Sequence, residues 1–532
     1  MSSVGPGRRY RRSRMRIGAL DLGSNSFHLL VADVHPDGTF ASITREKDML
    51  RLGDEVARDG RISDTTAHRV VESVRHMKQI ADASGATEVI AKATSAIRSA
   101  ANGSEVVDQI EAATGIDVEV ISGHEEARLI FAAVRASVVI DPSPALCIDL
   151  GGGSVELMVG DANRLLWVTS LNLGVGRLTE RFVHSDPPSK SERQALEAHL
   201  RETLAPVAEE VARHAPRMTV GSSGTLSDLA AMVAASQTGE EPRSRNQLTV
   251  TRADFLPVHE RIVRAKVSER RRMPGLEEKR AELIVAGSTF LAVAMDVFDF
   301  DQITISEWAL REGIVLDAVG HHDPDDWSDD PRALRRAAVA SLARRCQSAP
   351  DHTRQVVRLV LELFDQTQAL HGLGPADREL LEYAVLLHDI GQHVSQQGHH
   401  RHAAYLVEHA QLRGFSPDEV TFLAALVRHH RRGDPKPSEP LYGALSHRDR
   451  ERVRRLAAIL RVADGLDRGR RGVVAHVSTQ ITDNLVILRL RVEGDAELEL
   501  WAARRRRDLF EKVFDRELEV VVEPAERTAV ND

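Results

Sequence analysis

The chain of 532 residues is 42% hydrophobic and 28% charged, which is enough apolar material for the cores of about three or four domains. Its two cysteines, Cys147 and Cys346, match no metal-ligand spacing and exclude a disulfide framework, so the composition favours a reducing cytoplasm. The formal net charge of −9 excludes long-range attraction of a polyanion by the whole molecule, and any polyanion site must be locally basic.

The first 14 residues are basic and carry almost no apolar side chains. Their five arginines favour a solvated tail over a phosphate-binding arm, and Met15 is an alternative start of the chain. The apolar stretch that follows is interrupted at Asp21, before a secretory core can form, and no window is long and apolar enough to span a membrane. We therefore expect neither export nor a membrane partner.

Two α/β lobes are predicted, over residues 15–140 and 141–320. The first lobe is expected to contain strands at 16–22, 27–34, 88–93 and 118–121, and helices over 63–83, near Ser95 and Ser104, and from Gly123. The second lobe begins with the same design, an apolar strand at 145–149, a glycine turn and an alternating strand at 155–159. A helix over 307–319 is expected to close it.

Two turns share the form D-L-G-x-x-S, one starting at Asp21 and the other at Asp149, 128 residues further along. Recurrence of one design indicates two related lobes. A strand that ends in aspartate and turns through glycine brings successive backbone N–H groups near one point, where a phosphate can sit. Two such turns facing each other would clamp a phosphate chain, and a third loop at 221–225 would join them.

The rest of the chain changes character after residue 320. An acidic, proline-bounded stretch at 321–331 predicts a linker. Residues 332–475 carry apolar side chains at helical spacing and predict a helical domain, and residues 476–532 predict a small α+β extension.

Five stretches carry a resemblance to a known family: D-L-G-S-N-S-F-H at 21–28, A-T-S-A-I-R at 93–98, I-S-G-H-E-E-A-R at 121–128, I-D-L-G-G-G-S-V-E at 148–156 and G-S-S-G-T at 221–225. With these motifs in this order, the chain resembles the exopolyphosphatase and guanosine pentaphosphate phosphatase family, a branch of the actin, Hsp70 and sugar-kinase superfamily. The resemblance implies an actin-like (ASKHA) two-lobed phosphatase core.

The resemblance assigns the role of catalytic base to Glu126. Attack on phosphorus requires a carboxylate that orients and deprotonates water, whereas without the motif Glu126 would be an acidic residue that favours a helix N-terminus. Arg98 is expected beside it, as a catalytic arginine that holds a phosphate bidentately. Arg280 is expected to be a further substrate arginine, with a surface arginine as the alternative.

Asp149 and Glu156 stand on either side of the second glycine turn and are expected to hold Mg²⁺, which prefers hard oxygen ligands. The alternatives are a strand-end turn residue and the polar face of a strand. The residues expected to bind successive phosphates are Ser24, Asn25, Gly151, Gly152, Ser154, Ser223, Gly224 and Thr225. Cys147 has no identifiable histidine partner, so direct attack by water is expected rather than a phosphoenzyme.

The helical domain has its own histidine pattern, beginning with His388-Asp389 at the end of an apolar helix. This region resembles an HD-type phosphohydrolase fold, in which a second metal site would contain His352, His388, Asp389, His402, His429 and Asp464. Imidazole and carboxylate together suit a transition metal. The alternatives are buried packing histidines, or a relic that binds polyphosphate or a nucleotide. The expected fold is therefore an α/β actin-like core, a mostly α-helical HD-like domain and an α+β C-terminal tail.

By resemblance, the expected activity is that of an exopolyphosphatase, which releases terminal orthophosphate from inorganic polyphosphate by metal-assisted water attack. The alternatives are a guanosine pentaphosphate (pppGpp) 5'-phosphohydrolase that uses the same cleft, and a regulator that binds polyphosphate or (p)ppGpp with a residual HD site. Basic stretches at 448–455 and 504–507 either follow a long phosphate chain or form solvated helix faces. Few aromatic residues interleave them, so no specific nucleic acid is expected. The resemblance is compatible with a homodimer.

Overall fold

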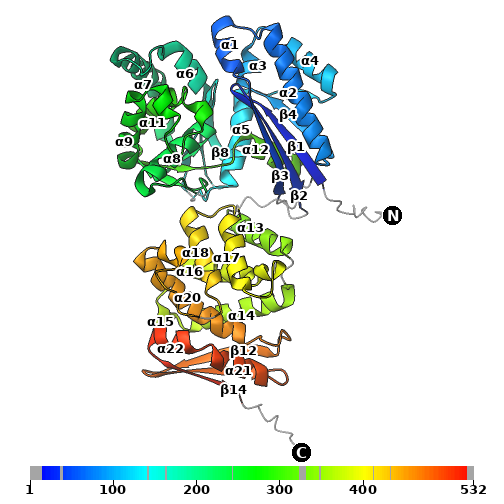
Figure 1. The fold of residues 1–532 in the computed structure, drawn as a ribbon, viewed down its shortest axis with the longest axis vertical. Helices are drawn as coiled ribbons and strands as arrows, with labels where there is room; N and C mark the ends of the chain where they lie inside the picture. Colours follow the sequence, from blue (N-terminus) through cyan, green and yellow to red (C-terminus); the bar gives the residue numbers. More distant parts are fainter. Residues whose placement is uncertain are drawn as a thin grey trace, which may run out of the picture. The chain divides into compact units, whose positions relative to one another are not determined.

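The structure, a computed structural model, describes residues 15–35, 40–140, 143–161, 164–242, 244–322, 331–346, 349–410, 412–431 and 433–523. The chain divides into two compact units, Met1–Leu334 and Arg335–Asp532 (Figure 1). The basic tail expected at 1–14 and residues 323–330 of the expected linker lie outside the described residues.

The first sheet of unit 1 has the spatial order β3 (Phe40–Met49), β2 (Ser26–Val34), β1 (Met15–Leu22), β4 (Glu88–Ala93) and β5 (Val118–Val120). β1, β2 and β3 are antiparallel neighbours, and β4 and β5 extend the sheet in parallel with β1. β1 and β2 are fully paired up to the turn, where Leu22 lies opposite Phe27. The turn therefore projects from the end of the sheet.

The second sheet repeats this arrangement. Its order is β8 (Leu165–Leu171), β7 (Val155–Gly160), β6 (Ala145–Leu150), β9 (Met218–Ser222), β11 (Gln302–Ile305) and β10 (Thr249–Thr251). β6, β7 and β8 are antiparallel, β9 and β11 follow in parallel with β6, and β10 closes the edge antiparallel to β11. β1 and β6, which lead into the two D-L-G-x-x-S turns, thus occupy the same place in their sheets, as expected of two related lobes.

Helices cover both sheets of unit 1 (Figure 1). Around the first sheet they are α1 (Leu52–Asp59), α2 (Asp64–Ala83), α3 (Ser95–Ser99) and α4 (Gly103–Thr114). Around the second sheet they are α6 (Val175–Phe182), α7 (Lys190–Arg213), α8 (Gly224–Thr238), α9 (Arg252–Arg264), α10 (Val267–Arg270), η1 (Glu278–Arg280) and α11 (Ile284–Val297). Each set buries its own apolar core against its sheet.

Two further helices, α5 (Gly123–Arg135) and α12 (Leu310–His322), pack against each other. α5 lies on β7 and β8 of the second sheet, whereas α12 lies on β1 and β2 of the first. A single core joins the inner faces of both sheets through these two helices. The chain begins α5 because the Ser122 side chain accepts a hydrogen bond from the Glu125 amide, an N-cap that places Glu126 in the first turn.

Unit 2 is mainly helical and ends in a three-stranded sheet (Figure 1). Its helices are α13 (Pro331–Arg345), α14 (Pro350–Gln366), α15 (Gln368–His371), α16 (Pro375–Leu387), η2 (Ile390–His393), α17 (His399–His409), α18 (Pro417–Arg428), α19 (Pro440–Gly443), α20 (His447–Gly465), α21 (Glu497–Arg505) and α22 (Asp508–Phe514). The strands are β12 (Val474–Ile481), β13 (Leu485–Val492) and β14 (Glu517–Val522). One hydrophobic core runs from the helices into these strands, so the C-terminal extension packs as part of unit 2.

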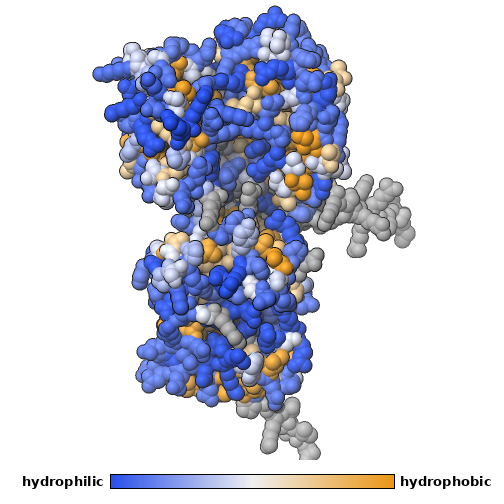
Figure 2. All heavy atoms as spheres, viewed as in Figure 1, coloured by the Kyte–Doolittle hydropathy of each residue, from blue (hydrophilic) through white to orange (hydrophobic). Residues whose placement is uncertain are grey.

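Apolar side chains form only small, separate patches on the drawn face of each unit (Figure 2). Among the described residues, no helix is long and apolar enough to cross a membrane.

Candidate active site

A cavity of about 430 Å³ lies where the ends of the two sheets of unit 1 meet. Both D-L-G-x-x-S turns line it, together with the first residues of α5, α8 and α12. The expected site residues among its lining are Ser24, Asn25, Glu126, Asp149, Gly151, Gly152, Ser154, Glu156, Ser223, Gly224, Thr225 and Arg280. Residues that are up to 256 positions apart in the sequence therefore surround one space.

The two glycine turns contact each other, and glycine is needed for that approach. A Cβ added to Gly153 would lie 2.5 Å from the Ser24 Oγ and 3.0 Å from the Ser95 Oγ. The first turn is held by its carbonyl groups, because Asn25 accepts hydrogen bonds from the Leu50 and Arg51 amides. Any larger side chain on the second turn would push the lobes apart where they enclose the cavity.

Four carboxylates line the cavity, the partly buried Asp21 and the buried Glu126, Asp149 and Glu156. Burial raises the pKa of Asp21 to about 8, against the attraction of Arg311, and raises that of Asp149 to about 7. Burial, reinforced by Glu126 and Asp149, also raises the pKa of Glu156 well above its usual value. A cation in the cavity would offset the repulsion among the charged forms of these carboxylates.

Asp149 and Glu156 lie directly opposite each other on the antiparallel strands β6 and β7. The Glu156 carboxylate accepts a hydrogen bond of 2.7 Å from the Ser170 hydroxyl. In the first sheet the equivalent pair is Asp21 and His28, which lie opposite each other on β1 and β2. The repeated architecture thus places a histidine in one lobe where the other has a carboxylate.

Glu126 and Arg98 form a partly buried ion pair, with 3.1 Å between Arg98 Nη1 and Glu126 Oε2. Burial raises the pKa of Glu126, and the Arg98 guanidinium opposes that effect. Arg98 also donates to the Ile121 carbonyl and is not among the described residues that line the cavity. The expectation that Arg98 holds a phosphate stays a prediction, because its Nη1 contacts Glu126 and the backbone.

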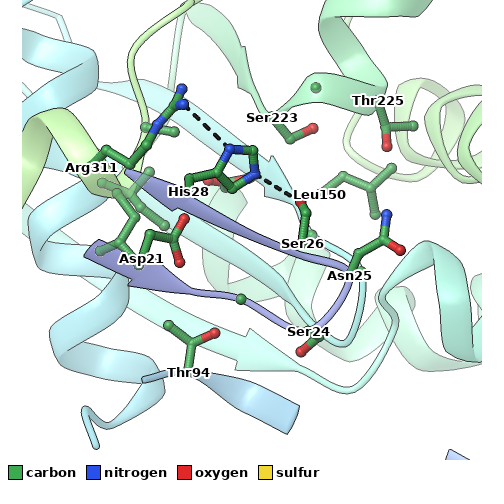
Figure 3. A pocket seen from close by; sticks show the side chains of 18 of the residues that line it. Asp21, Ser24, Asn25, Ser26, His28, Thr94, Leu150, Ser223, Thr225 and Arg311 are labelled. Atoms are coloured by element: carbon green, nitrogen blue, oxygen red, sulfur yellow. Dashed lines mark hydrogen bonds between the residues drawn. The ribbon is translucent and has the colours of Figure 1, made fainter. Parts of the chain in front are cut away.

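Sequence reasoning missed His28 and Arg311, which lie next to each other in the lining of the cavity (Figure 3). His28 Nε2 lies 2.7 Å from the Ser26 hydroxyl, and Arg311 donates to His28 Nδ1 over 3.3 Å. Burial, followed by the charges of Arg311, Lys47 and Arg280, lowers the pKa of His28 well below its usual value. The imidazole is therefore neutral, and with Nδ1 accepting from Arg311 its Nε2–H donates to Ser26.

A fully buried aspartate, Asp228 on α8, organises two cavity arginines. Its Oδ1 accepts from Arg245 over 2.6 Å, and its Oδ2 accepts from Arg280 over 2.9 Å. Arg280 also pairs with Glu277, and it lies so close to Gly224 that a Cβ there would be 2.0 Å from its Nη2. Asp228 and Arg245 were missed, although a lone carboxylate in an otherwise apolar helix was a visible signal.

The third loop contains a strained residue. Ser223 has φ of 100° and ψ of 156°, a conformation that glycine adopts readily and other residues seldom do. Its hydroxyl accepts a hydrogen bond from the Leu226 amide and so caps α8, while Thr225 lies in the first turn of that helix and lines the cavity (Figure 3). The first turn of α8 is thereby directed at the cavity.

In unit 2 the structure brings together four of the six expected metal ligands: His352, His388, Asp389 and Asp464. The other two expected ligands, His402 and His429, lie outside the groups that the described residues form, and their role stays a prediction. His399 and His430 take their places, with 3.3 Å between the two Nε2 atoms.

The positions of His402 and His429 outside these groups have a local cause. His402 lies three residues after His399 on α17, which places it about 4.5 Å further along the helix axis. His429 follows the last residue of α18, and its ring packs 5.7 Å from that of Tyr442 instead. Adjacent or near-adjacent histidines thus point in different directions, which the sequence pattern did not resolve.

The basic run 504–507 is largely engaged within unit 2. Arg504 donates to the Val520 carbonyl and Arg507 to the Leu518 carbonyl, while Arg506 pairs with Asp464. These contacts tie α21 to β14 and to the histidine cluster, so the run is not a uniformly solvated face.

Comparisons with known proteins agree with these features. The family model of the Ppx/GppA phosphatase family matches residues 30–322, and that of Ppx/GppA phosphatase, domain III, matches residues 334–503. The chain is 34% identical over 340 residues to Exopolyphosphatase 1 of Mycobacterium bovis, and the matched segment covers 63% of this chain and 96% of that protein. It is also 34% identical over 303 residues to Exopolyphosphatase 1 of Mycobacterium leprae, covering 57% and 89% of the two chains.

Solved structures are similar to more than half of the chain. A crystal structure of an exopolyphosphatase from Cytophaga hutchinsonii is 30% identical with a TM-score of 0.55, covering 58% of this chain and 98% of that one. The Aquifex aeolicus member of the Ppx/GppA family is 28% identical with a TM-score of 0.51, covering 58% and 99%. With five motifs in order, the two-lobed fold and family matches to both units, the chain belongs to the Ppx/GppA phosphatase family.

Proposed function

We propose that unit 1 is an exopolyphosphatase, which hydrolyses the terminal phosphoanhydride bond of inorganic polyphosphate and releases orthophosphate. The observation that carries the proposal is the position of Glu126, a buried carboxylate in one cavity with both glycine turns and the Arg280 guanidinium. The names of the similar proteins, two called Exopolyphosphatase 1 and one an exopolyphosphatase, support the choice of substrate.

Glu126 is the proposed general base. Its raised pKa makes it a stronger proton acceptor than an exposed carboxylate, and Arg98 holds one carboxylate oxygen in place. As the oxygen of water bonds to the terminal phosphorus, a proton passes to Glu126. The bond from that phosphorus to the bridging oxygen then breaks, and the chain leaves one phosphate shorter.

The phosphates are proposed to lie along the two turns and the third loop. The proposed hydrogen-bond donors are Ser24 and Asn25 from the first turn, Gly152 and Ser154 from the second, and Ser223, Gly224 and Thr225 from the third. Gly151, whose amide donates to the Ser154 carbonyl, would line the phosphate path. Arg280 would neutralise phosphate charge, with Arg245 beside it on the same aspartate. This local positive charge meets the requirement that a net acidic protein needs a basic polyanion site.

Phosphatases of this family are metal-dependent in general. The proposed ligands are Asp149 and Glu156, and the ion is proposed to be Mg²⁺, because both donors are hard carboxylate oxygens that lie opposite each other on paired strands. Their raised pKa values support this fit, since a cation would relieve the repulsion among the buried carboxylates. When bound, the ion would neutralise charge on the phosphoryl oxygens.

Unit 2 is proposed to be an HD-like module, on the basis of the His388-Asp389 pair that follows α16 and the histidines gathered around it.

The second candidate substrate for unit 1 is pppGpp, whose terminal phosphate would occupy the same cavity. Polyphosphate is the leading proposal, because the similar proteins are named as exopolyphosphatases.

The test is Mg²⁺-dependent release of orthophosphate from long-chain polyphosphate and from pppGpp, measured side by side with wild type and Glu126→Gln protein. Polyphosphate should be hydrolysed faster, and the substitution should lower kcat about a hundredfold or more while KM changes little, since a general base contributes about 10² to 10⁴. Release that survives the substitution would remove Glu126 from its role. Faster release from pppGpp would reverse the order of the substrates.

A further inference from the structure

A second cluster of ionisable side chains lies in unit 2. Five of its residues line a small cavity of about 100 Å³: His352, Asp389, His399, His430 and Asp464. His388, the sixth, lies beside Asp389 and Asp464. The six residues come from α14, from the segments that follow α16 and α18, from α17 and from α20. The four imidazoles and Asp389 are at least nine-tenths buried.

All four imidazoles are held by their Nδ1 atoms and present their Nε2 atoms to one another. Nδ1 of His388 lies 2.6 Å from the Val385 carbonyl, and Nδ1 of His430 lies 2.7 Å from the Val427 carbonyl. A carbonyl only accepts, so each Nδ1 must donate and each Nε2 carries a lone pair. This arrangement, in which a second partner fixes the tautomer, is typical of metal-ligating histidines.

The other two histidines follow the same rule. Nδ1 of His399 lies 3.1 Å from the Gln396 carbonyl, and Nδ1 of His352 lies 2.7 Å from the buried carboxylate of Asp467. His388 adds a second observation, because its Nε2 is completely buried and has no hydrogen-bond partner. A buried imidazole nitrogen without a partner costs free energy unless something else binds it.

The donor atoms are spaced for two ions. One group contains His352, His388 and Asp389, and the other contains Asp389, His399 and His430, with the ligand atoms of each group within 4.8 Å of one another. Asp464 joins the first group, since its Oδ1 lies 3.6 Å from His352 Nε2 and 3.8 Å from His388 Nε2. Donors about 2.1 Å from one ion stand about 3.0 to 3.4 Å apart, so small movements complete each shell.

Asp389 is the residue common to both groups. Its Oδ1 lies 3.3 Å from His399 Nε2 and 3.8 Å from His388 Nε2, while its Oδ2 lies 3.9 Å from His352 Nε2. Asp389 thus lies between histidines of both groups, as a bridging carboxylate requires, and its Oδ2 also pairs with Arg470. Imidazole and carboxylate donors together suit Mn²⁺, Fe²⁺ or Zn²⁺ better than Mg²⁺.

Arginines surround the opening of this metal-ligand cluster. Arg431, Arg468, Arg470 and Arg506 line the small cavity, and three of them, all but Arg470, also line a neighbouring cavity of about 600 Å³. That larger cavity adds Arg461, Arg505 and Lys512. An anionic group at the ions would therefore have a basic space for the remainder of its molecule.

We propose that unit 2 contains a two-metal site, bridged by Asp389, that hydrolyses a terminal phosphoryl group independently of Glu126. The oxygen of water forms a bond to phosphorus, the bond from phosphorus to the leaving oxygen breaks, and a proton from water ends on that oxygen. A phosphate ester thus yields an alcohol and orthophosphate, and an anhydride yields two phosphates. The proposal rests on unit 2 alone and stands or falls separately from exopolyphosphatase activity in unit 1.

The first experiment measures metal content. Full-length protein is stripped with a chelator and reloaded with Mn²⁺, and bound metal is measured by elemental analysis and by paramagnetic resonance. In the Asp149→Asn background, which removes the metal proposed for unit 1, about two ions per chain should remain, with the signal of a coupled pair. His399→Ala and Asp389→Asn should each lower the content, whereas His402→Ala, a half-buried histidine on the same helix, should not.

The second experiment measures hydrolysis in the Glu126→Gln background, with Mn²⁺ and with p-nitrophenyl phosphate as the ester and pyrophosphate as the anhydride. Release from either probe should persist in this background, fall at least tenfold with His399→Ala, and remain with His402→Ala. The ester and anhydride arms decide which bond the site accepts. The proposal is overturned if the chain binds no more metal than the His399→Ala variant, or if neither probe is hydrolysed; thermal unfolding identifies a variant that fails to fold, and the milder His399→Gln then replaces it.

Discussion

Gly152 of the second turn faces Asn25 of the first, so closely that a Cβ on Gly152 would lie 2.7 Å from the Asn25 Cβ and 3.1 Å from its backbone nitrogen. The two residues belong to different lobes and are joined only through the fold. Their contact sets the width of the cavity, because both turns line it beside this contact.

Gly152→Ala should therefore lower kcat/KM for polyphosphate about tenfold or more, since the added methyl group must displace the first turn. The matched control is Gly320→Ala in α12, where a Cβ meets nothing within 4 Å. Steady-state kinetics and thermal unfolding of both variants provide the measurement. Equal activity in the two variants would show that the spacing of the turns does not matter.

Asp228→Asn should raise KM for polyphosphate about tenfold, with a smaller effect on kcat, because it removes the charge that holds Arg245 and Arg280 at the cavity. Asp296 offers a matched control, since it also pairs with two arginines, Arg201 and Arg252, at the surface. Asp296→Asn should leave both constants unchanged.

Thermal unfolding distinguishes an effect of Asp228→Asn on phosphate binding from an effect on stability. Because Asp228 is fully buried, its substitution also leaves two guanidinium groups without their shared partner, and the unfolding midpoint should fall. Arg280→Lys keeps the charge but loses the planar fork, so it should raise KM with little change in the midpoint. A normal KM in Arg280→Lys would contradict the role of Arg280 in binding phosphate.

Arg98→Gln should move the acidic limb of the kcat/KM profile to higher pH. The Arg98 guanidinium lowers the pKa of Glu126, so its removal leaves the base protonated up to a higher pH. Arg128→Gln is the control, because Arg128 lies on α5, the helix that carries Glu126, but pairs with Glu125 and Asp317 at the surface. A profile that keeps its acidic limb while losing activity uniformly would make Arg98 merely structural.

Removal of divalent cations should make the stability of unit 1 depend on pH. Asp21 and Asp149 have folded-state pKa values of about 8 and about 7, above the unfolded value of about 3.9. The folded state therefore binds more protons, and the stability that these groups contribute is full below about pH 4 and is lost as pH rises through 7 and 8.

Thermal unfolding with a chelator, from pH 5 to 8, measures this loss. Asp149→Asn cannot ionise at that position, so its midpoint should rise relative to wild type as the pH increases. Addition of Mg²⁺ should stabilise wild type at pH 8 and leave the variant nearly unchanged. A difference between the two proteins that stays constant with pH would be inconsistent with the buried carboxylate cluster.

The sequence alone predicted the local elements of the cleft well. The structure has β1, β2, β4, β6 and β7 close to their expected places, because alternation, glycine turns and capping residues act over a few neighbouring positions. The same locality explains why the repeated turn predicted two lobes: each strand–turn–strand unit is encoded within a short stretch. The expected helix over 307–319 begins three residues later, at Leu310.

Tertiary structure alone decided which distant groups meet. Asp228 and Arg280 are 52 residues apart and no periodicity links them, because their ion pair depends on how α8 packs against the loop that carries η1. Packing likewise selects His430 over His429 and turns Arg98 toward Glu126, since the direction of a side chain follows from the neighbours that bury it. Composition and spacing determined the kinds of chemistry available to this chain, and long-range packing determined which residues share a site.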